Sequence, residues 1–198
     1  MPDDRFALRV PPFTRSWSLA GQPLNVTDEA DLILVRHNSL WASLIAHAQM
    51  LGEIAHPEWR GYTWANHVGV SRRMPDGTMA VSEMGPRGYE RRSVAEYVER
   101  DACVLHFDVS DELRANAVAN DEAMSGIDYG WLSFLPDALA VFSHEDLAVT
   151  AQNHIVCSAH GTLVMMGLGL FPALVPTAVI PVHLTMWTDS RLPRPAGV

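Results

Sequence analysis

The sequence predicts an α+β domain, because strand-length apolar runs and helix-length amphipathic patterns follow one another along the chain. Three features support this prediction: an apolar run at residues 31–35, a helical pattern over residues 40–51, and the Pro75-Asp76-Gly77 turn signature between two β-type runs. With 198 residues and 48% hydrophobic content, the chain can bury one core of ordinary size. We therefore expect one domain with one main site.

The charge and the apolar stretches of the chain argue against two classes of partner. The formal net charge is -9, whereas nucleic-acid backbones and anionic lipid surfaces are bound by basic faces, so we expect no nucleic-acid partner. Residues 147–188 contain no charged residue except histidine, but Pro172, Pro176 and Pro181 interrupt them. No unbroken apolar run of about 20 residues survives, so we expect no membrane span but a buried helix followed by buried extended chain.

Cysteine content and the N-terminal residues indicate a reducing compartment. Two cysteines, Cys103 and Cys157, are too few for a disulfide framework in a chain of this size, and neither belongs to a Cys-x-x-Cys pair. We expect one or both to be free thiols. Residues 1–13 lack the basic start and the apolar run of a signal peptide, so a cytoplasmic location is the expectation.

The chain is predicted to have three parts. Residues 1–28 are rich in Pro, Gly and polar residues without sustained periodicity, which predicts an extended N-terminal arm. Residues 29–188 form the expected domain, and residues 189–198 form a short C-terminal tail. No internal repeat or low-complexity tract interrupts this organisation.

The first half of the domain is predicted to be a strand, a helix and a hairpin. In chain order, we expect a strand at residues 31–35, a helix over 40–51, a loop at 56–65, and strands at 66–71 and 78–84. Either Asn38 or Ser39 could cap the helix. The two strands should form a β-hairpin because Pro75-Asp76-Gly77 is typical of a turn.

The second half of the domain is predicted to be richer in helices. After a turn at residues 85–88, we expect a short helix at 94–98, a strand at 103–109, a helix from Ser110 to about Ser125 and a helix from Cys157 to about Leu168. Asp111 and Glu112 follow Ser110 in the first turn, where the helix dipole favours acids. Residues 126–150 give no clear pattern, and residues 163–170 should be buried in the core.

The predicted hairpin suggests a hydrogen-bonded pair of polar side chains. His67 and Glu83 lie at equal sequence distances from Pro75, so a loop of odd length centred on Pro75 would set them directly opposite each other. Opposed residues of an antiparallel pair have Cβ atoms about 5 Å apart, within reach of a hydrogen bond between imidazole and carboxylate. Such an acid fixes the tautomer of a histidine base and stabilises its imidazolium, as in a nucleophile-base-acid triad.

Cys157 is the candidate nucleophile. It stands at the predicted N-terminus of a helix, where the positive end of the helix dipole stabilises a thiolate. Cys103 lies instead in an alternating strand pattern, where cysteine is usually a small buried hydrophobe. His67, Glu83 and Cys157 are therefore the candidate catalytic residues. Each of them alone more often has a structural role, so the interpretation depends on their combination.

The order of these motifs resembles the circularly permuted branch of the NlpC-type papain-like cysteine hydrolases, over about residues 30–170. In that branch, similar motifs supply the first strand, the base, the third polar residue and finally the nucleophile; here they are Asp31-Leu32-Ile33-Leu34-Val35, Asn66-His67-Val68-Gly69-Val70, Val81-Ser82-Glu83 and Ile155-Val156-Cys157-Ser158. The resemblance implies a permuted papain-like fold in which an antiparallel β-sheet packs against helices. The cysteine at a helix N-terminus then faces the histidine and its partner on the sheet.

The resemblance also implies an activity. It implies hydrolysis of an amide or acyl bond through an acyl-enzyme on Cys157, with a peptidoglycan stem peptide as the first candidate substrate and an acyl lipid as the next. The Cys157 backbone N–H would contribute to an oxyanion hole, and Tyr129 and Ser158 are further candidates for oxyanion or substrate contacts. No cofactor and no metal are expected. Family members often carry an acid two residues after the nucleophile, where this chain has Ala159.

Two other classes of function remain open. The spacing His154-x-x-Cys157-x-x-His160 is typical of metal ligands, and on a helix these residues would lie along one face, although no second cluster offers a fourth zinc ligand. The third class is a structural or docking subunit of a phage tail or cell-wall assembly, with or without residual peptidoglycan hydrolase activity. The arm and the proline-interrupted C-terminal region suit a chain that packs against others. Assembly partners or a homo-oligomer, and a virion-associated location, belong to this alternative.

Overall fold

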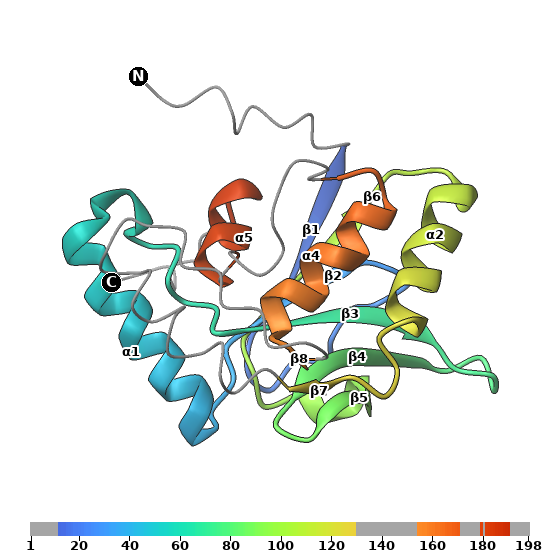
Figure 1. Ribbon diagram of the computed structural model, residues 1–198, viewed down its shortest axis with the longest axis horizontal. Helices are drawn as coiled ribbons and strands as arrows, with labels where there is room; N and C mark the ends of the chain where they lie inside the picture. Colours follow the sequence, from blue (N-terminus) through green and yellow to red (C-terminus); the bar gives the residue numbers. More distant parts are fainter. Residues whose placement is uncertain (1–11, 130–153, 171–178, 180, 191–198) are drawn as a thin grey trace.

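The computed structural model describes residues 12–129, 154–170, 179 and 181–190, with the backbone alone at residues 40, 41, 129, 154 and 155 (Figure 1). These residues form an α+β structure with a six-stranded sheet in which every neighbouring pair is antiparallel. The α+β class predicted from the sequence is therefore confirmed.

The sheet has the strand order β1-β6-β2-β3-β4-β5. Its strands are β1 (Phe13–Ser18), β2 (Leu32–Val35), β3 (His67–Arg73), β4 (Met79–Gly85), β5 (Gly88–Ser93) and β6 (Ala102–Phe107). Every residue of β2 is buried, and β3 and β4 are buried over most of their length. A separate parallel pair is formed by β7 (Asp128–Tyr129) and β8 (His154–Ile155).

The structure describes four α-helices and two short 3-10 helices. They are α1 (Leu40–Ala55), α2 (Asp111–Glu122), α4 (Cys157–Gly167) and α5 (Pro181–Trp187), together with the short 3-10 helices η2 (Pro57–Trp59) and η3 (Val94–Tyr97). Figure 1 shows α4 lying across β3 with α2 alongside it, and α1 on the opposite side of the view from α2. Strand β3 begins with His67 and helix α4 begins with Cys157, and the two elements pack directly on each other.

Two serines cap the N-termini of helices α1 and α2. The Ser39 side chain accepts a hydrogen bond from the Ala42 N–H at the start of α1, so Ser39 is the cap. Ser110 accepts in the same way from the Leu113 N–H at the start of α2. Both helix starts agree with the sequence prediction.

The main core lies between one face of the sheet and the helices α2 and α4. Val68 and Leu105 of the sheet belong to the same buried cluster as Val164 of α4. Glycine is required where α4 meets its neighbours, because a Cβ at Gly161 would lie 2.6 Å from Val68 Cγ1 and one at Gly167 would lie 2.5 Å from the Ala117 backbone. These two close approaches fix α4, and hence its first residue, against β3 and α2.

The apolar segment 163–170 is part of this core, as predicted. Val164, Met165, Leu168 and Leu170 are each at most 2% exposed. None of the helices that the structure describes is both long enough and apolar enough to cross a membrane.

Strands β1 and β5 and helix α5 were not predicted. Strand β1 lies within the predicted arm and pairs with β6 at one edge of the sheet, so residues 13–18 belong to the sheet. Strand β5 forms the other edge, and its polar sequence Gly-Tyr-Glu-Arg-Arg-Ser has no alternation of apolar residues. The expectation of extended chain at residues 181–187 is wrong, because Pro181 begins α5; proline is tolerated in the first turn of a helix, where its missing N–H costs no hydrogen bond.

Candidate active site

The β3–β4 hairpin holds His67 beside Glu83, but not in the expected register. Gly69, not His67, pairs with Glu83, so the prediction that the two residues are directly opposite is wrong. They are diagonal neighbours on the same face, because His67 lies two residues from Gly69. The two long side chains span this diagonal: His67 Nε2 lies 2.8 Å from Glu83 Oε2.

The turn explains the difference in register. The Met74 N–H donates to the Thr78 carbonyl, and the Gly77 N–H donates to the Met74 carbonyl. The loop therefore consists of residues 75–77 and is centred on Asp76, not on Pro75. Gly77 has φ +85°, as expected for the left-handed residue that closes a three-residue hairpin loop.

Cys157 completes the arrangement. It is the first residue of α4, as predicted, and its side chain lies close enough to the His67 imidazole to raise the pKa of that histidine. Because Glu83 occupies Nε2 of the imidazole, Nδ1 is the nitrogen available to the sulfur. The structure thus brings together the three residues that the sequence pattern indicated, with the imidazole hydrogen-bonded to the carboxylate and within electrostatic range of the thiol.

The electrostatics of the site favour the charged forms of His67 and Glu83. Burial alone would lower the pKa of His67, but its interactions with Glu83 and with Cys157 raise it to about 10. Burial would raise the pKa of Glu83, but the charge and hydrogen bond of His67, together with Tyr97 and Arg92, lower it to about 2. An imidazolium of this kind stabilises a neighbouring thiolate.

Two residues that the sequence analysis missed hold Glu83. The Tyr97 hydroxyl donates to Oε2, the oxygen that also binds His67. Arg92 Nε lies 2.7 Å from Oε1 and forms an ion pair there rather than a well-directed hydrogen bond. Arg92 reaches this position from β5, where Glu90 pairs with Glu83 and Arg92 is the next residue on the same face. The polar edge strand that supplies it was itself not predicted.

The first turn of α4 suits an oxyanion. The first N–H groups of a helix have no intrahelical partner, and no described side chain caps α4, so these groups can receive an oxyanion. The Ser158 hydroxyl donates to the Val179 carbonyl, which gives it a structural contact. Tyr129 pairs with Ile155 in the β7–β8 ladder, just ahead of α4, and its side chain lies outside the described residues.

The three candidate metal ligands, His154, Cys157 and His160, do not belong to one helix. His154 belongs to β8 and α4 begins only at Cys157, so the expectation that the three residues share one helix face is wrong. His160 Nε2 lies 2.7 Å from Asp121 Oδ1.

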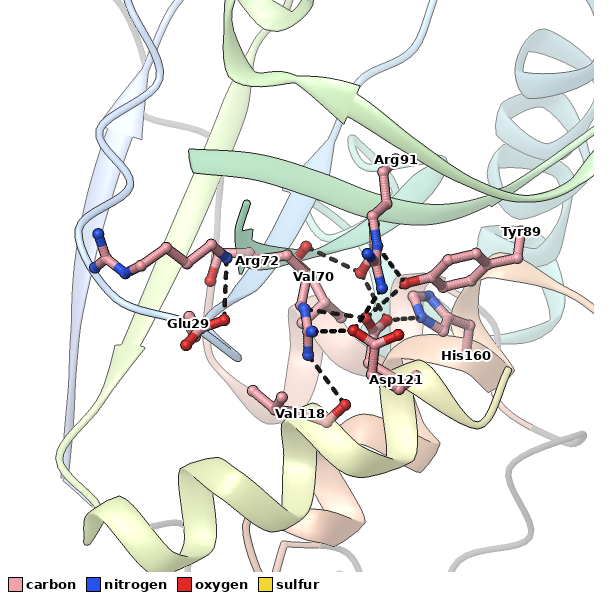
Figure 2. A network of polar contacts seen from close by, with 12 residues as sticks. Glu29, Val70, Arg72, Tyr89, Arg91, Val118, Asp121 and His160 are labelled. Atoms are coloured by element: carbon pink, nitrogen blue, oxygen red, sulfur yellow. Dashed lines mark hydrogen bonds and ion pairs between the residues drawn. The ribbon is translucent and has the colours of Figure 1, made fainter. Parts of the chain in front are cut away.

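His160 belongs to a buried polar network that anchors α4 (Figure 2). Asp121 of α2 accepts hydrogen bonds from Ser82 of β4 at 2.6 Å and from Tyr89 of β5 at 2.7 Å, in addition to the contact with His160. Arg72 Nε of β3 lies 3.4 Å from the same carboxylate. The network joins three strands and α2 to α4, one turn beyond Cys157, and nothing in the local sequence patterns predicted it.

Cys103 has the buried strand position that its sequence pattern predicts. It is fully buried on β6 as a free thiol. Burial raises the pKa of Cys103 to about 12. Its environment therefore disfavours a thiolate at neutral pH.

No protein-family model matches this chain, and a search of curated proteins finds no match either.

Proposed function

We propose that this protein is a cysteine hydrolase in which Cys157 is the nucleophile, His67 is the base and Glu83 orients the base. One observation carries the proposal: the His67 imidazole is hydrogen-bonded to Glu83 and interacts electrostatically with Cys157, the first residue of a helix. Nucleophile, base and acid in this order are the requirement for nucleophilic catalysis by cysteine.

The proposed reaction has two steps. The Cys157 thiolate attacks the carbonyl carbon, a C–S bond forms, and the carbonyl electron pair moves to the oxygen, which the Cys157 N–H and its neighbours stabilise. The His67 imidazolium then gives its proton to the leaving amine or alkoxide, and the bond to that group breaks, leaving a thioester. In the second step, His67 takes a proton from water, whose oxygen attacks the thioester and releases the acid and the thiolate.

The resemblance to the permuted NlpC-type papain-like hydrolases supports an amide of a peptidoglycan stem peptide as the first candidate substrate and an acyl ester as the second. The antiparallel sheet packed on a helix that begins with Cys157 is in keeping with that resemblance. The permuted papain-like topology itself is part of the proposal.

Hydrolysis assays with matched cysteine variants test the proposal. Purified protein is incubated with peptidoglycan stem peptides and, separately, with acyl esters, and the products are identified by mass spectrometry. Cys157→Ala should abolish hydrolysis, whereas Cys103→Ala, which removes the other buried thiol, should retain it. Hydrolysis that survives in Cys157→Ala would refute the assignment of the nucleophile.

A second function, docking in a multi-subunit assembly, is favoured by the surface of α1. Leu44, Met50, Leu51 and Ile54 are exposed on this helix, Ile54 at 81%. Large apolar side chains gathered on one exposed helix are typical of an interaction surface. Light scattering of the wild type and of Leu51→Asp/Ile54→Asp tests this function, because loss of a self-associated species in the variant would support it and monomers in both would contradict self-association.

A further inference from the structure

A cavity of about 230 Å³ opens beside the proposed base. Its polar lining includes His37, Asn66, His67, Glu83, Arg92 and Arg100. Cys157 is not one of the described residues that line this cavity. A group bound in this cavity would therefore belong to a part of the substrate next to the reacting bond, not to the bond itself.

Arg100 supplies the uncompensated charge of this cavity. The Glu83 carboxylate is balanced by His67 and by Arg92. Arg92 Nη atoms also lie 3.0 Å from Glu90 and 3.2 Å from Glu96. Among the described residues, no carboxylate lies within ion-pairing distance of Arg100. The Nη1 atom of Arg100 is buried, and no described residue accepts a hydrogen bond from it. A buried guanidinium N–H without an acceptor is costly, which indicates a place for a ligand oxygen.

The Arg100 guanidinium is also held in place. Its central carbon lies 4.7 Å from the centroid of the Tyr97 ring, in a cation-π contact. The Tyr97 hydroxyl in turn donates to Glu83. Arg100 is thus positioned by the same tyrosine that positions the proposed acid, so a ligand on Arg100 would be fixed relative to the base.

His37, which lines the same cavity, is a second donor. Its Nδ1 accepts a hydrogen bond from the Ser39 N–H at 3.1 Å. Burial, and then the nearby charges of Arg100 and His67, lower the pKa of His37 to about 4, so the ring is neutral at pH 7. A neutral imidazole that accepts at Nδ1 carries its proton on Nε2. This N–H has no acceptor among the residues that the structure describes.

We infer that this cavity binds a carboxylate group of the substrate, with Arg100 and His37 as the donors that determine specificity. The inference rests on the proposed hydrolase function and names a feature of its substrate: a carboxylate close to the bond that is cleaved. One uncompensated positive charge matches one negative charge, and two donors match the two oxygens of a carboxylate. A neutral amide at the same position would leave the charge of Arg100 unpaired.

Binding of two small probes that differ only in this group tests the inference. N-acetylalanine carries a carboxylate, and N-acetylalaninamide is its neutral counterpart; each is titrated into the full chain and followed by NMR. The acid should bind about tenfold more tightly or better, as expected for a charge-assisted hydrogen bond to Arg. Equal affinities, or no measurable binding of the acid, would overturn the inference.

Arginine variants assign the effect to the cavity. Arg100→Gln should remove the preference for the acid, and Arg100→Lys should keep part of it because the charge remains. Arg87→Gln is the matched control: Arg87 is 80% exposed, does not line the cavity, and its substitution removes the same charge. A preference that survives in Arg100→Gln, or that disappears equally in Arg87→Gln, would contradict the role of Arg100.

Alkylation by iodoacetamide, a neutral reagent, separates this inference from the proposed function. If Cys157 is alkylated preferentially but the acid shows no advantage, the carboxylate site is wrong and the nucleophile stands. If the acid binds through Arg100 but Cys157 does not react, the hydrolase proposal fails and the carboxylate site stands.

Discussion

Arg92 Nε lies 2.7 Å from Glu83 Oε1, the carboxylate oxygen that His67 and Tyr97 leave free. Both oxygens of Glu83 therefore have partners, which fixes the plane of the carboxylate and favours its charged form. A carboxylate held in this way can orient the His67 ring and stabilise its imidazolium. The proposed role of Glu83 thus depends on two residues that do not touch the nucleophile.

Replacement of Glu83 tests this role. Glu83→Gln keeps the shape of the side chain but removes its charge, so the pKa of His67 should fall and hydrolysis should decrease by about 10²- to 10⁴-fold, less completely than in Cys157→Ala. Glu96→Gln is the control: Glu96 also pairs with Arg92, and glutamine can still serve its capping box. Equal losses of hydrolysis in both variants would contradict a specific role for Glu83.

Two tyrosines offer a matched comparison. Tyr97 donates its hydroxyl to Glu83, and Tyr89 donates its hydroxyl to Asp121. Tyr97→Phe and Tyr89→Phe should each lower the free energy of unfolding by about 1.5 to 3 kcal/mol, because each leaves a buried carboxylate with one hydrogen bond fewer. Only Tyr97→Phe should change the pH dependence of Cys157 alkylation. Denaturant unfolding and alkylation rates check the two effects, and an identical pH profile in Tyr97→Phe and the wild type would refute the second.

The stability of the fold should depend on pH in two windows. The pKa of Glu83 is lowered to about 2, so its contribution is present above about pH 4.3, its unfolded value, and is lost as pH falls toward 2. The pKa of His67 is raised to about 10, so its contribution is complete below about pH 6.5 and is lost as pH rises toward 10. Urea unfolding should show both declines in the wild type and weaker ones in Glu83→Gln. Equal slopes in the two proteins would contradict the coupling of the pair.

The Asp121 network should stabilise the fold without taking part in the chemistry. Asp121→Ala leaves the buried Arg72 without this partner and removes the acceptor of His160. We expect a loss of about 3 to 5 kcal/mol in the free energy of unfolding, measured in urea. Asp108→Ala removes an exposed acid at the end of β6 and should have little effect. Similar stabilities of the two variants would show that the network does not anchor α4.

Local patterns in the sequence predicted the elements that carry the site. The helix caps at Ser39 and Ser110, the hairpin and the helix that starts at Cys157 all follow from short-range rules. The register of the hairpin did not, because it depends on whether Pro75 or Asp76 is the centre of the loop, a choice that Gly77 decides through its positive φ.

The contacts that hold the site depend on residues far apart in the chain. Arg92 reaches Glu83 only because β5 pairs with β4, and Asp121 reaches His160 only because α2 packs beside α4. Neither contact leaves a periodic signal in the sequence. A polar edge strand such as β5 resembles a loop until its partner strand is known.

Alkylation of the folded protein with iodoacetamide at about pH 6, followed by peptide mass spectrometry, tests the central claim most directly. Cys157 should be modified faster than a free thiol at the same pH, because the His67 imidazolium stabilises its thiolate, and Cys103 should remain unmodified. His67→Ala should remove the advantage of Cys157 at this pH. If Cys157 reacts no faster than a free thiol, or reacts equally fast in His67→Ala, Cys157 is not the activated nucleophile that we propose.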